Sequence, residues 1–489
     1  MTKPLTLMLF LPLLGVILIG LLPERHSRYA RSIALSASGV TLWVAWGLLA
    51  AFDPTTAAVQ FVERQPWLVP TGSSYLLGVD GFSLPMILLA TLLSFVALLS
   101  SASIRDHRRG FYLFMLLLEM GMLGVFMAQD WSLFYIFWEL TLIPLFFLVN
   151  RWGGVRRQQA ALNLVLYTMG GSVFLLVGLL LGFDAAHVDS FAMETMTTGL
   201  RAASSKTQIL IFFGFLLGFG VKIPVFPIHG WLPLAHVEAP SPVSILLSGV
   251  LLKMGAYGLI RAAAMLPLAV LALQSWLMAF ALFSLIYGAV LAWRQTDLKA
   301  MVAYSSISHM GLVLLGIASL TVAGVLGAVT QMVAHGLSAA ALFLLVGLLY
   351  QRTHTRAVGD YGSLLKTAPR FVVCLSLALV AAIGMPGTIG FIAEWHVLLG
   401  GFQQWGWLVL WLSLGMIISA AYSVRTIGHL CTGPLPAQTV AVSDLTFLES
   451  VTVGLLMIWI LFLGVVPAPL LHLIAGSVRH FVTLFAGYR

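Results

Sequence analysis

Apolar runs long enough to cross a lipid bilayer recur along this chain from one end to the other. A transmembrane helix needs roughly 17–25 predominantly apolar residues, and the run lengths indicate about fourteen such spans. The composition agrees, because 60% of the residues are hydrophobic, only 9% are charged and the mean hydropathy is +1.01. The sequence therefore predicts an all-α, polytopic integral membrane protein.

The spans follow one another without a linker or a low-complexity tract, so residues 1–489 are interpreted as a single membrane domain. No small-residue cleavage site follows the first span, which we expect to be retained rather than removed as a signal peptide. The longest polar connection, 53–80, is expected to carry a short interfacial segment. The predicted spans are 5–22, 31–52, 81–101, 110–128, 131–150, 161–182, 207–228, 236–260, 272–292, 299–318, 322–349, 370–400, 405–430 and 446–468.

Lysine and arginine are distributed unevenly between the two sets of alternating connections. Because basic loops stay inside, the richer set marks the inner side and predicts that both chain ends lie outside. The fifteen inner residues are Arg25, Arg28, Arg31, Arg105, Arg108, Arg109, Arg151, Arg156, Arg157, Arg294, Arg352, Arg356, Lys366, Arg370 and Arg425. The seven outer residues are Lys3, Arg64, Arg201, Lys206, Arg261, Arg479 and Arg489.

Several functions are disfavoured by what the chain contains. The net charge of +8 is spread over short loops and forms no basic stripe, so we expect no nucleic-acid partner. Cys374 and Cys431 form no CxxC pair, and two thiols cannot hold an iron–sulfur cluster. The sequence contains no GxGxxG or Walker A string, so we expect no redox cofactor in this chain. Neither His309 nor His335 has a second metal ligand one helical turn away, which disfavours a metal site.

We single out eight ionisable residues within the predicted spans as candidates. A charge at a helix centre in a membrane costs on the order of 2.5–3.5 kcal/mol, and an intramembrane ionisable residue is a functional candidate by default. The eight are Glu119, Glu139, Lys222, Lys253, His309, His335, Lys299 and Glu394.

Two of these charges lie in spans that prolines and glycines should interrupt. Lys222 lies two residues before Pro224, and Glu394 follows the run that contains Gly384 and Pro386. A broken helix beside an ionisable group is the usual construction of an ion site in a transporter. The breaks lie five spans apart, which predicts two inverted five-helix repeats, roughly 110–260 and 272–430.

For four of these eight residues a purely structural interpretation stays open. Glu119 could simply hydrogen-bond to a neighbouring helix, and Lys299, at a span start, could extend to the membrane interface. His309 and His335 could lie neutral in a polar core without relaying a proton. For the other four charges their depth favours a functional role. The aromatic residues near Glu139 are interpreted as lipid-facing or as helix packing: Phe134, Phe137 and Trp138.

The chemistry that such a set supports is proton movement. Burial disfavours the charged form of a lysine, whereas a nearby carboxylate favours it. A change in the distance between Glu139 and Lys222 would therefore switch the lysine between holding and releasing a proton. Histidine titrates near neutral pH and suits an intermediate relay, and Glu394 would accept the proton near the far exit.

The same segments resemble a known family. The stretch 219–261, FGVKIPVFPIHGWLPLAHVEAPSPVSILLSGVLLKMGAYGLIR, is similar to the signature of the antiporter-like subunits of respiratory complex I and its relatives. The similarity covers nearly the whole chain. Four further motifs are WELTLIPLFFLVNRWGG (138–154), DLKAMVAYSSISHMG (297–311), QMVAHGLSAAALFLLVG (331–347) and MPGTIGFIAEW (385–395).

Glu394 matches the M-type, or subunit 4, pattern among the paralogues, since the N-type, L-type and Mrp relatives have lysine there. The resemblance implies that Glu139 and Lys222 are a coupling pair and that Lys253 is the central lysine. It further implies water-linked relays at His309 and His335. Two positions depart from the family pattern: Leu234, where relatives have Asp or Lys, and Ala393, where they have Gly.

The resemblance also implies partners and cofactors. We expect neighbouring antiporter-like chains and other membrane-arm subunits, with NAD(P)H or ferredoxin, FMN, iron–sulfur clusters and quinone bound by those partners. The expected location is a bacterial inner membrane or a cyanobacterial thylakoid, with both termini on the periplasmic or lumenal side. The first hypothesis is therefore a proton-translocating subunit of a complex I-like NAD(P)H (or ferredoxin):quinone oxidoreductase. The alternatives are an Mrp-type cation/proton antiporter subunit and a scaffold that translocates nothing.

Overall fold

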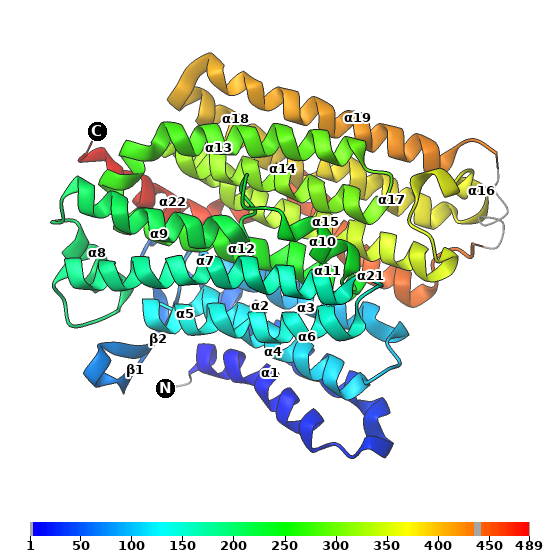
Figure 1. Cartoon of the computed structure of the whole chain (residues 1–489), viewed down its shortest axis with the longest axis horizontal. Helices are drawn as coiled ribbons and strands as arrows, with labels where there is room; N and C mark the ends of the chain where they lie inside the picture. The colour runs from blue at the N-terminus through cyan, green and yellow to red at the C-terminus, as the bar shows by residue number, and fades with distance from the viewer. Residues whose placement is uncertain (1–2, 435–441, 489) are drawn as a thin grey trace.

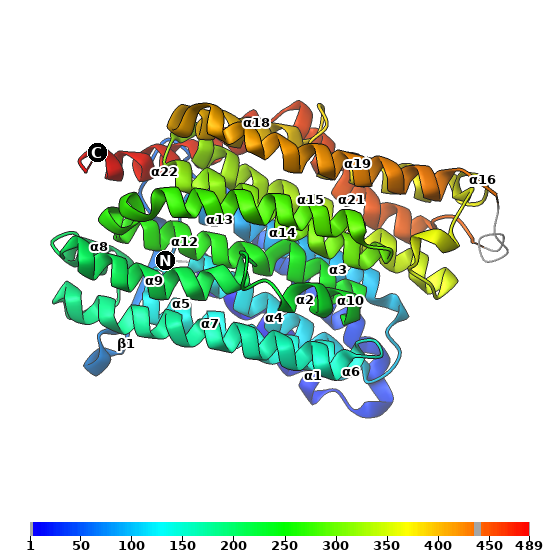
Figure 2. The same cartoon turned by 45° about the horizontal axis from the view of Figure 1, so that its top comes forward.

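The computed structural model describes residues 3–434 and 442–488, which form a bundle of roughly parallel helices (Figures 1 and 2). Arg489, one of the outer basic residues, lies outside the described residues. Figure 1 shows both chain ends, β1, β2 and α8 at one end of the bundle and α16 at the other. We call these the terminal end and the α16 end.

The elements of the first half are α1 (Pro4–Leu21), α2 (Ala30–Ala51), β1 (Gln60–Leu68), β2 (Ser73–Val79), α3 (Ser83–Ser100), α4 (Arg108–Met127), α5 (Trp131–Leu140), α6 (Leu142–Trp152), α7 (Arg157–Ala186), α8 (Met193–Leu200), α9 (Ser205–Lys222), α10 (Trp231–Glu238), α11 (Ser241–Leu246) and α12 (Leu252–Met265). Those of the second half are α13 (Pro267–Arg294), α14 (Leu298–Ser319), α15 (Val322–Thr353), α16 (Leu364–Thr367), α17 (Pro369–Ala382), α18 (Ile389–Trp405), α19 (Trp411–Cys431), α21 (Phe447–Val465) and α22 (Ala468–Ala486).

Fourteen helical stretches of the described residues are long and apolar enough to cross a membrane, which confirms the predicted fold class. The central stretches 241–265 and 322–353 are the most enclosed, because other helices surround them. The two predicted breaks are present. One separates α9 from α10, and the other separates α17 from α18. Figure 1 shows that α9 starts at the terminal end and α17 at the α16 end, so the two broken helices run in opposite directions.

The C-terminal part differs from the prediction in detail. Residues 389–431 form one apolar stretch, but Gly406, with φ +60°, reverses the chain between α18 and α19. The last helix, α22, was not predicted. It lies against the segment before α3, where Ser477 Oγ accepts a hydrogen bond from the Gly81 backbone N–H at 3.0 Å. The sequence did not reveal α22 as a separate helix because only two residues separate α22 from α21.

The polar connection 53–80 carries an antiparallel hairpin, β1–β2, rather than only a short interfacial segment. Its side chains reach the first helix. Glu63 accepts hydrogen bonds from the backbone N–H groups of Leu5 and Thr6 at 2.8 and 3.0 Å. These two N–H groups lie in the first turn of α1, where they have no partner within the helix. The hairpin therefore caps α1 at the terminal end, so the expectation of an all-α protein needs this addition.

The connections at the α16 end are held together by ion pairs between basic and acidic side chains. Arg109 pairs with Glu24 at 3.0 Å, and Arg356 pairs with Asp297 at 3.1 Å. Arg352 pairs with Glu449 at 2.6 Å. Some of the basic residues on the predicted inner side therefore also hold these connections together.

Candidate functional site

Lys222 is the last residue of α9 and is buried at 2% exposure. Its Nζ donates to Thr141 Oγ1 at 3.1 Å and lies 3.9 Å from the centre of the Trp138 ring. The helix ends here because Pro224 has no backbone N–H to continue it. The lysine thus lies at a helix break with a hydroxyl and an aromatic face as its neighbours.

Glu139 lies on α5, beside the residues that contact Lys222, but it does not form an ion pair in the described part of the chain. Its side chain is partly exposed at the surface of the bundle, and its Oε1 is buried without a hydrogen-bond partner. Glu139 is nevertheless near enough to interact electrostatically with Lys222. Glu139 and Lys222 are therefore near each other but not in direct contact. A contact that forms and breaks requires this geometry.

Lys253 is fully buried near the start of α12, directly after a π-helical turn, Leu247–Leu251. A π-turn leaves the normal hydrogen-bond ladder of the helix and is frequent at functional sites. Here Lys253 Nζ donates to the carbonyl oxygen of Ser248 at 2.6 Å. The same nitrogen lies 2.7 Å from His335 Nδ1 on α15. The π-turn therefore supplies one of the two partners of the central lysine.

The two predicted histidines lie side by side, with ring centres 5.4 Å apart. His309 Nδ1 lies 3.4 Å from Gln331 Nε2. The Nε2 atoms of His309 and His335 are buried and have no hydrogen-bond partner in the protein. Lys253, His335 and His309 therefore form a buried row of groups that can gain and lose protons, and the free ring nitrogens leave bonding capacity for water.

Glu394 lies on α18, six residues after the second break, and is 3% exposed. Its Oε2 has no hydrogen-bond partner. The carboxylate packs against the backbone of Gly384, so closely that a Cβ on Gly384 would lie 2.1 Å from Oε2. The backbone of Gly384 has φ +67°, a conformation that glycine adopts without strain. The break and the carboxylate thus form one packed unit.

The two weaker candidates are also buried. Ser38 donates a hydrogen bond to Glu119 Oε1 at 3.0 Å, and Glu119 Oε2 has no partner. Lys299 donates to the Ala239 carbonyl and lines a cavity of about 540 Å³ at the α16 end. Lys299 is only 5% exposed and so does not extend to the interface as a surface lysine would. The structure brings Lys299 into the polar interior and leaves Glu119 at the α2–α4 contact.

Sequence reasoning missed two neighbours of this row. His236 on α10 is fully buried, both its ring nitrogens lack hydrogen-bond partners, and it interacts electrostatically with Lys253 and Lys299. Its position in the motif after the first break was the available signal. Trp138 was assigned only to packing or lipid contact, yet its ring lies beside the Lys222 ammonium group. A cation over an aromatic face is attracted to it, and no sequence pattern predicts that contact.

Close helix packing brings these groups together. Gly255 and Gly258 on α12 face α9, where a Cβ would lie 2.9 Å from the Phe219 carbonyl oxygen and 2.4 Å from its ring. Small residues at such contacts let two membrane helices approach closely. Lys222 and Lys253 are therefore held on adjacent helices. A membrane bundle with two oppositely directed broken helices and a buried row of Lys, His and Glu defines the class of ion-translocating membrane subunits.

Comparisons with known proteins agree with the class of ion-translocating membrane subunits and identify the family within that class. The transmembrane family described as NADH:quinone oxidoreductase/Mrp antiporter matches residues 128–419, and the chain belongs to this family. The chain is 37% identical to NADH-quinone oxidoreductase subunit M of Rhodobacter capsulatus over 99% of this chain and 97% of the relative. It is 40% identical to an NAD(P)H-quinone oxidoreductase chain 4 of Thermosynechococcus vestitus over 88% of this chain and 82% of the relative.

Solved structures show the same fold. A chain of respiratory complex I from Thermus thermophilus aligns with a TM-score of 0.90 and 30% identity, covering 98% of this chain and 99% of that one. A chain of the Mrp complex from Dietzia aligns with a TM-score of 0.86 at 19% identity, covering 99% of this chain and 98% of that one. The second similarity concerns the fold alone.

Proposed function

We propose that this chain is the M-type proton-translocating subunit of a complex I-like NAD(P)H (or ferredoxin):quinone oxidoreductase. The observation that carries the proposal is the buried contact between Lys253 Nζ and His335 Nδ1 at 2.7 Å, continued by the ring of His309. These groups can pass a proton, whereas a passive scaffold has no use for such costly buried groups. The Mrp-type alternative is weaker, since the similarity to the Mrp chain is only 19% in sequence and Glu394 stands where Mrp relatives have lysine.

The proposed path has a station at each helix break and the lysine–histidine row between them. At the first break, approach of Glu139 would stabilise the protonated form of Lys222, and withdrawal would favour release of its proton. Glu394 would take up the proton at the second break. The opposite directions of α9 and α17 support two inverted repeats, roughly 110–260 and 272–430.

The proposed function also implies an orientation of the chain in the membrane and a set of partner subunits. The basic connections support an orientation with the α16 end on the inner side, in which both termini would lie on the periplasmic or lumenal side of a bacterial inner membrane or a thylakoid. Neighbouring antiporter-like chains would contact it in the membrane arm. NAD(P)H and quinone, which the names of the relatives include, would be bound by partner subunits. We expect the same of FMN, of iron–sulfur clusters and of ferredoxin where it replaces NAD(P)H.

The test is Lys222→Ala in the assembled complex, reconstituted in sealed vesicles. We expect proton translocation to fall about tenfold or more, because removing a positioned proton carrier typically costs about 10²–10⁴-fold. The measurement is the number of protons moved per electron pair, with the electron-transfer rate recorded in parallel. Lys206→Ala, on the same helix but exposed, is the matched control and should match the unmodified complex. Normal pumping by Lys222→Ala would favour the scaffold hypothesis.

A further inference from the structure

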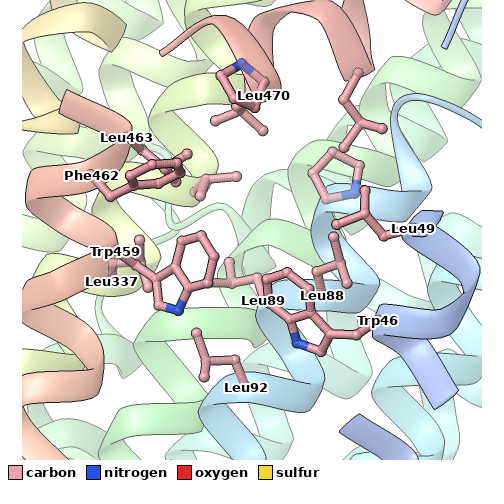
Figure 3. A pocket seen from close by; sticks show the side chains of 14 residues that line it. Trp46, Leu49, Leu88, Leu89, Leu92, Leu337, Trp459, Phe462, Leu463 and Leu470 are labelled. Atoms are coloured by element: carbon pink, nitrogen blue, oxygen red, sulfur yellow. The ribbon is translucent and has the colours of Figure 1, made fainter. Parts of the chain in front are cut away.

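The terminal end of the bundle contains a polar cavity that the path above does not use. It has a volume of about 600 Å³ and lies where α8, α12, α22 and the segment before α3 meet. An apolar cavity also exists, lined by Trp46, Trp459 and leucines such as Leu89, but nothing in it could bind or move an ion (Figure 3). The charged residues that line the polar cavity are Asp80, Glu194, Arg201 and Arg261, with His480 from α22.

An ion pair forms the inner wall of the polar cavity. Arg261 Nη1 donates to Asp80 Oδ2 at 2.7 Å, and Arg261 Nη2 donates to the Tyr257 hydroxyl at 2.9 Å. The other oxygen of Asp80 is also bound, since Oδ1 accepts hydrogen bonds from the backbone N–H groups of Phe82 and Ser83, both at 3.0 Å. Arg261 Nε is buried and has no hydrogen-bond partner, so the guanidinium group keeps one unused donor. Asp80 is held by the backbone at the start of α3, so a change in the ion pair has to come from Arg261.

Behind this ion pair, one face of α12 leads back to the central lysine. Lys253, Tyr257 and Arg261 follow one another at intervals of four residues, which places them on the same face about 5–6 Å apart. Lys253 is 0% exposed and Tyr257 is 1% exposed, so this face is enclosed by protein. Tyr257 donates to the Phe126 carbonyl at 3.1 Å and accepts from Arg261. Polar groups therefore line the interval between the buried lysine and the cavity.

We propose that the Arg261–Asp80 ion pair is the gate of a proton exit from Lys253 to the polar cavity at the terminal end; this inference rests on the proposed function. The Lys253 ammonium group gives up one proton, which passes by water and the Tyr257 hydroxyl to the Asp80 carboxylate. Asp80 then releases the proton into the cavity and becomes an anion again. Arg261 keeps its charge throughout, and Lys253 is left neutral until it receives a proton from the Lys222 side of the path. This exit is a branch at Lys253, beside the onward transfer through His335 toward Glu394.

The gate is closed in this structure. Burial by itself raises the pKa of Asp80, but the adjacent Arg261 guanidinium outweighs it and holds that pKa below its usual range. While Arg261 stays in contact, the Asp80 carboxylate therefore remains ionised and does not hold a proton. Lys253 meanwhile contacts Ser248, which precedes it by five residues, and His335, whereas Arg261 follows it on α12. The lysine is thus connected to the relay at a moment when the exit is blocked.

The experiment measures access to the space behind the gate. In the assembled complex, with Cys374 and Cys431 replaced by serine, Tyr257→Cys is exposed to a membrane-impermeant methanethiosulfonate from one side at a time. Adding Asp80→Asn should raise the labelling rate from the terminal side at least about tenfold, the factor that ~1.4 kcal/mol gives. Asn keeps the oxygen that accepts from Phe82 and Ser83, so the local fold is preserved. Arg261→Gln is the second gate variant and should act in the same direction.

Thr197→Cys, which lies in the cavity in front of the gate, is the matched control and should label equally with and without Asp80→Asn. In complexes that keep Tyr257, Asp80→Asn should also lower the protons moved per electron pair severalfold. The gate is wrong if the labelling rate at position 257 is unchanged by both gate variants, or if Asp80→Asn pumps normally. If Lys222→Ala abolishes pumping while those two results are found, only the proposed exit is wrong. If Lys222→Ala pumps normally, the proposed function itself is wrong.

Discussion

Replacing Lys253 by Met is expected to abolish most of the proton translocation that depends on this chain, by about tenfold or more. Met has a similar length and no charge, so it fills the space of the lysine stem without supplying a proton. Both contacts of the Lys253 ammonium group, to Ser248 and His335, are lost. The relay is then interrupted at its centre, between the first break and the histidines. The readout is the number of protons moved per electron pair.

The fold should tolerate this change. Loss of the hydrogen-bond donor to His335 costs about 1–3 kcal/mol of stability. Removal of the buried lysine charge offsets this loss, because keeping a charge out of water is itself costly. We therefore expect the variant complex to assemble and to keep a thermal midpoint close to that of the unmodified complex. Lys206→Met is the matched control, because it makes the same chemical change at an exposed position. Wild-type proton translocation by an assembled Lys253→Met complex would remove the central lysine from the path.

Gly384→Ala should impair proton translocation severalfold, whereas Gly387→Ala should not. Both glycines have positive φ angles, +67° and +92°, so alanine at either position is strained by about 1–2 kcal/mol. Only at Gly384 does the new Cβ meet Glu394, because nothing lies within 4 Å of a Cβ at Gly387. The Glu394 carboxylate must then move from its place beside the break.

The pair of variants separates backbone strain from the position of the carboxylate. Thermal unfolding of the two variant complexes should show similar losses of stability, and protons per electron pair should differ between them. Equal pumping by Gly384→Ala and Gly387→Ala would show that the placement of Glu394 against Gly384 has no functional weight. A loss in both variants would instead assign the effect to the backbone of the break.

The sequence predicted those features that depend on depth and on local backbone chemistry. Apolar run lengths gave the spans because each membrane helix satisfies its own backbone hydrogen bonds, independently of its neighbours. The breaks at Lys222 and before Glu394 were predictable because proline and glycine act locally. The resemblance of five motifs then indicated the family, which the comparisons confirm.

Features that depend on tertiary contacts were not predictable. The contact of Lys222 with Thr141 and Trp138, in place of an ion pair with Glu139, is decided by how α5 and α9 pack. The hairpin β1–β2 lies in a mixed polar stretch, and the helix that it caps, α1, is distant in sequence from Glu63. The contact of Arg261 with Asp80 spans 181 residues, so no local pattern could place the two together.

We propose that one proton path runs through both helix breaks of this chain. The most direct test compares Lys222→Ala, Glu394→Gln and the double variant in the assembled complex, by protons moved per electron pair. Groups that act in one path do not add their effects, so the double variant should pump as little as the more impaired single variant and no less. A double variant whose loss equals the product of the two single losses, or single variants that pump normally, would contradict a single path through Lys222 and Glu394.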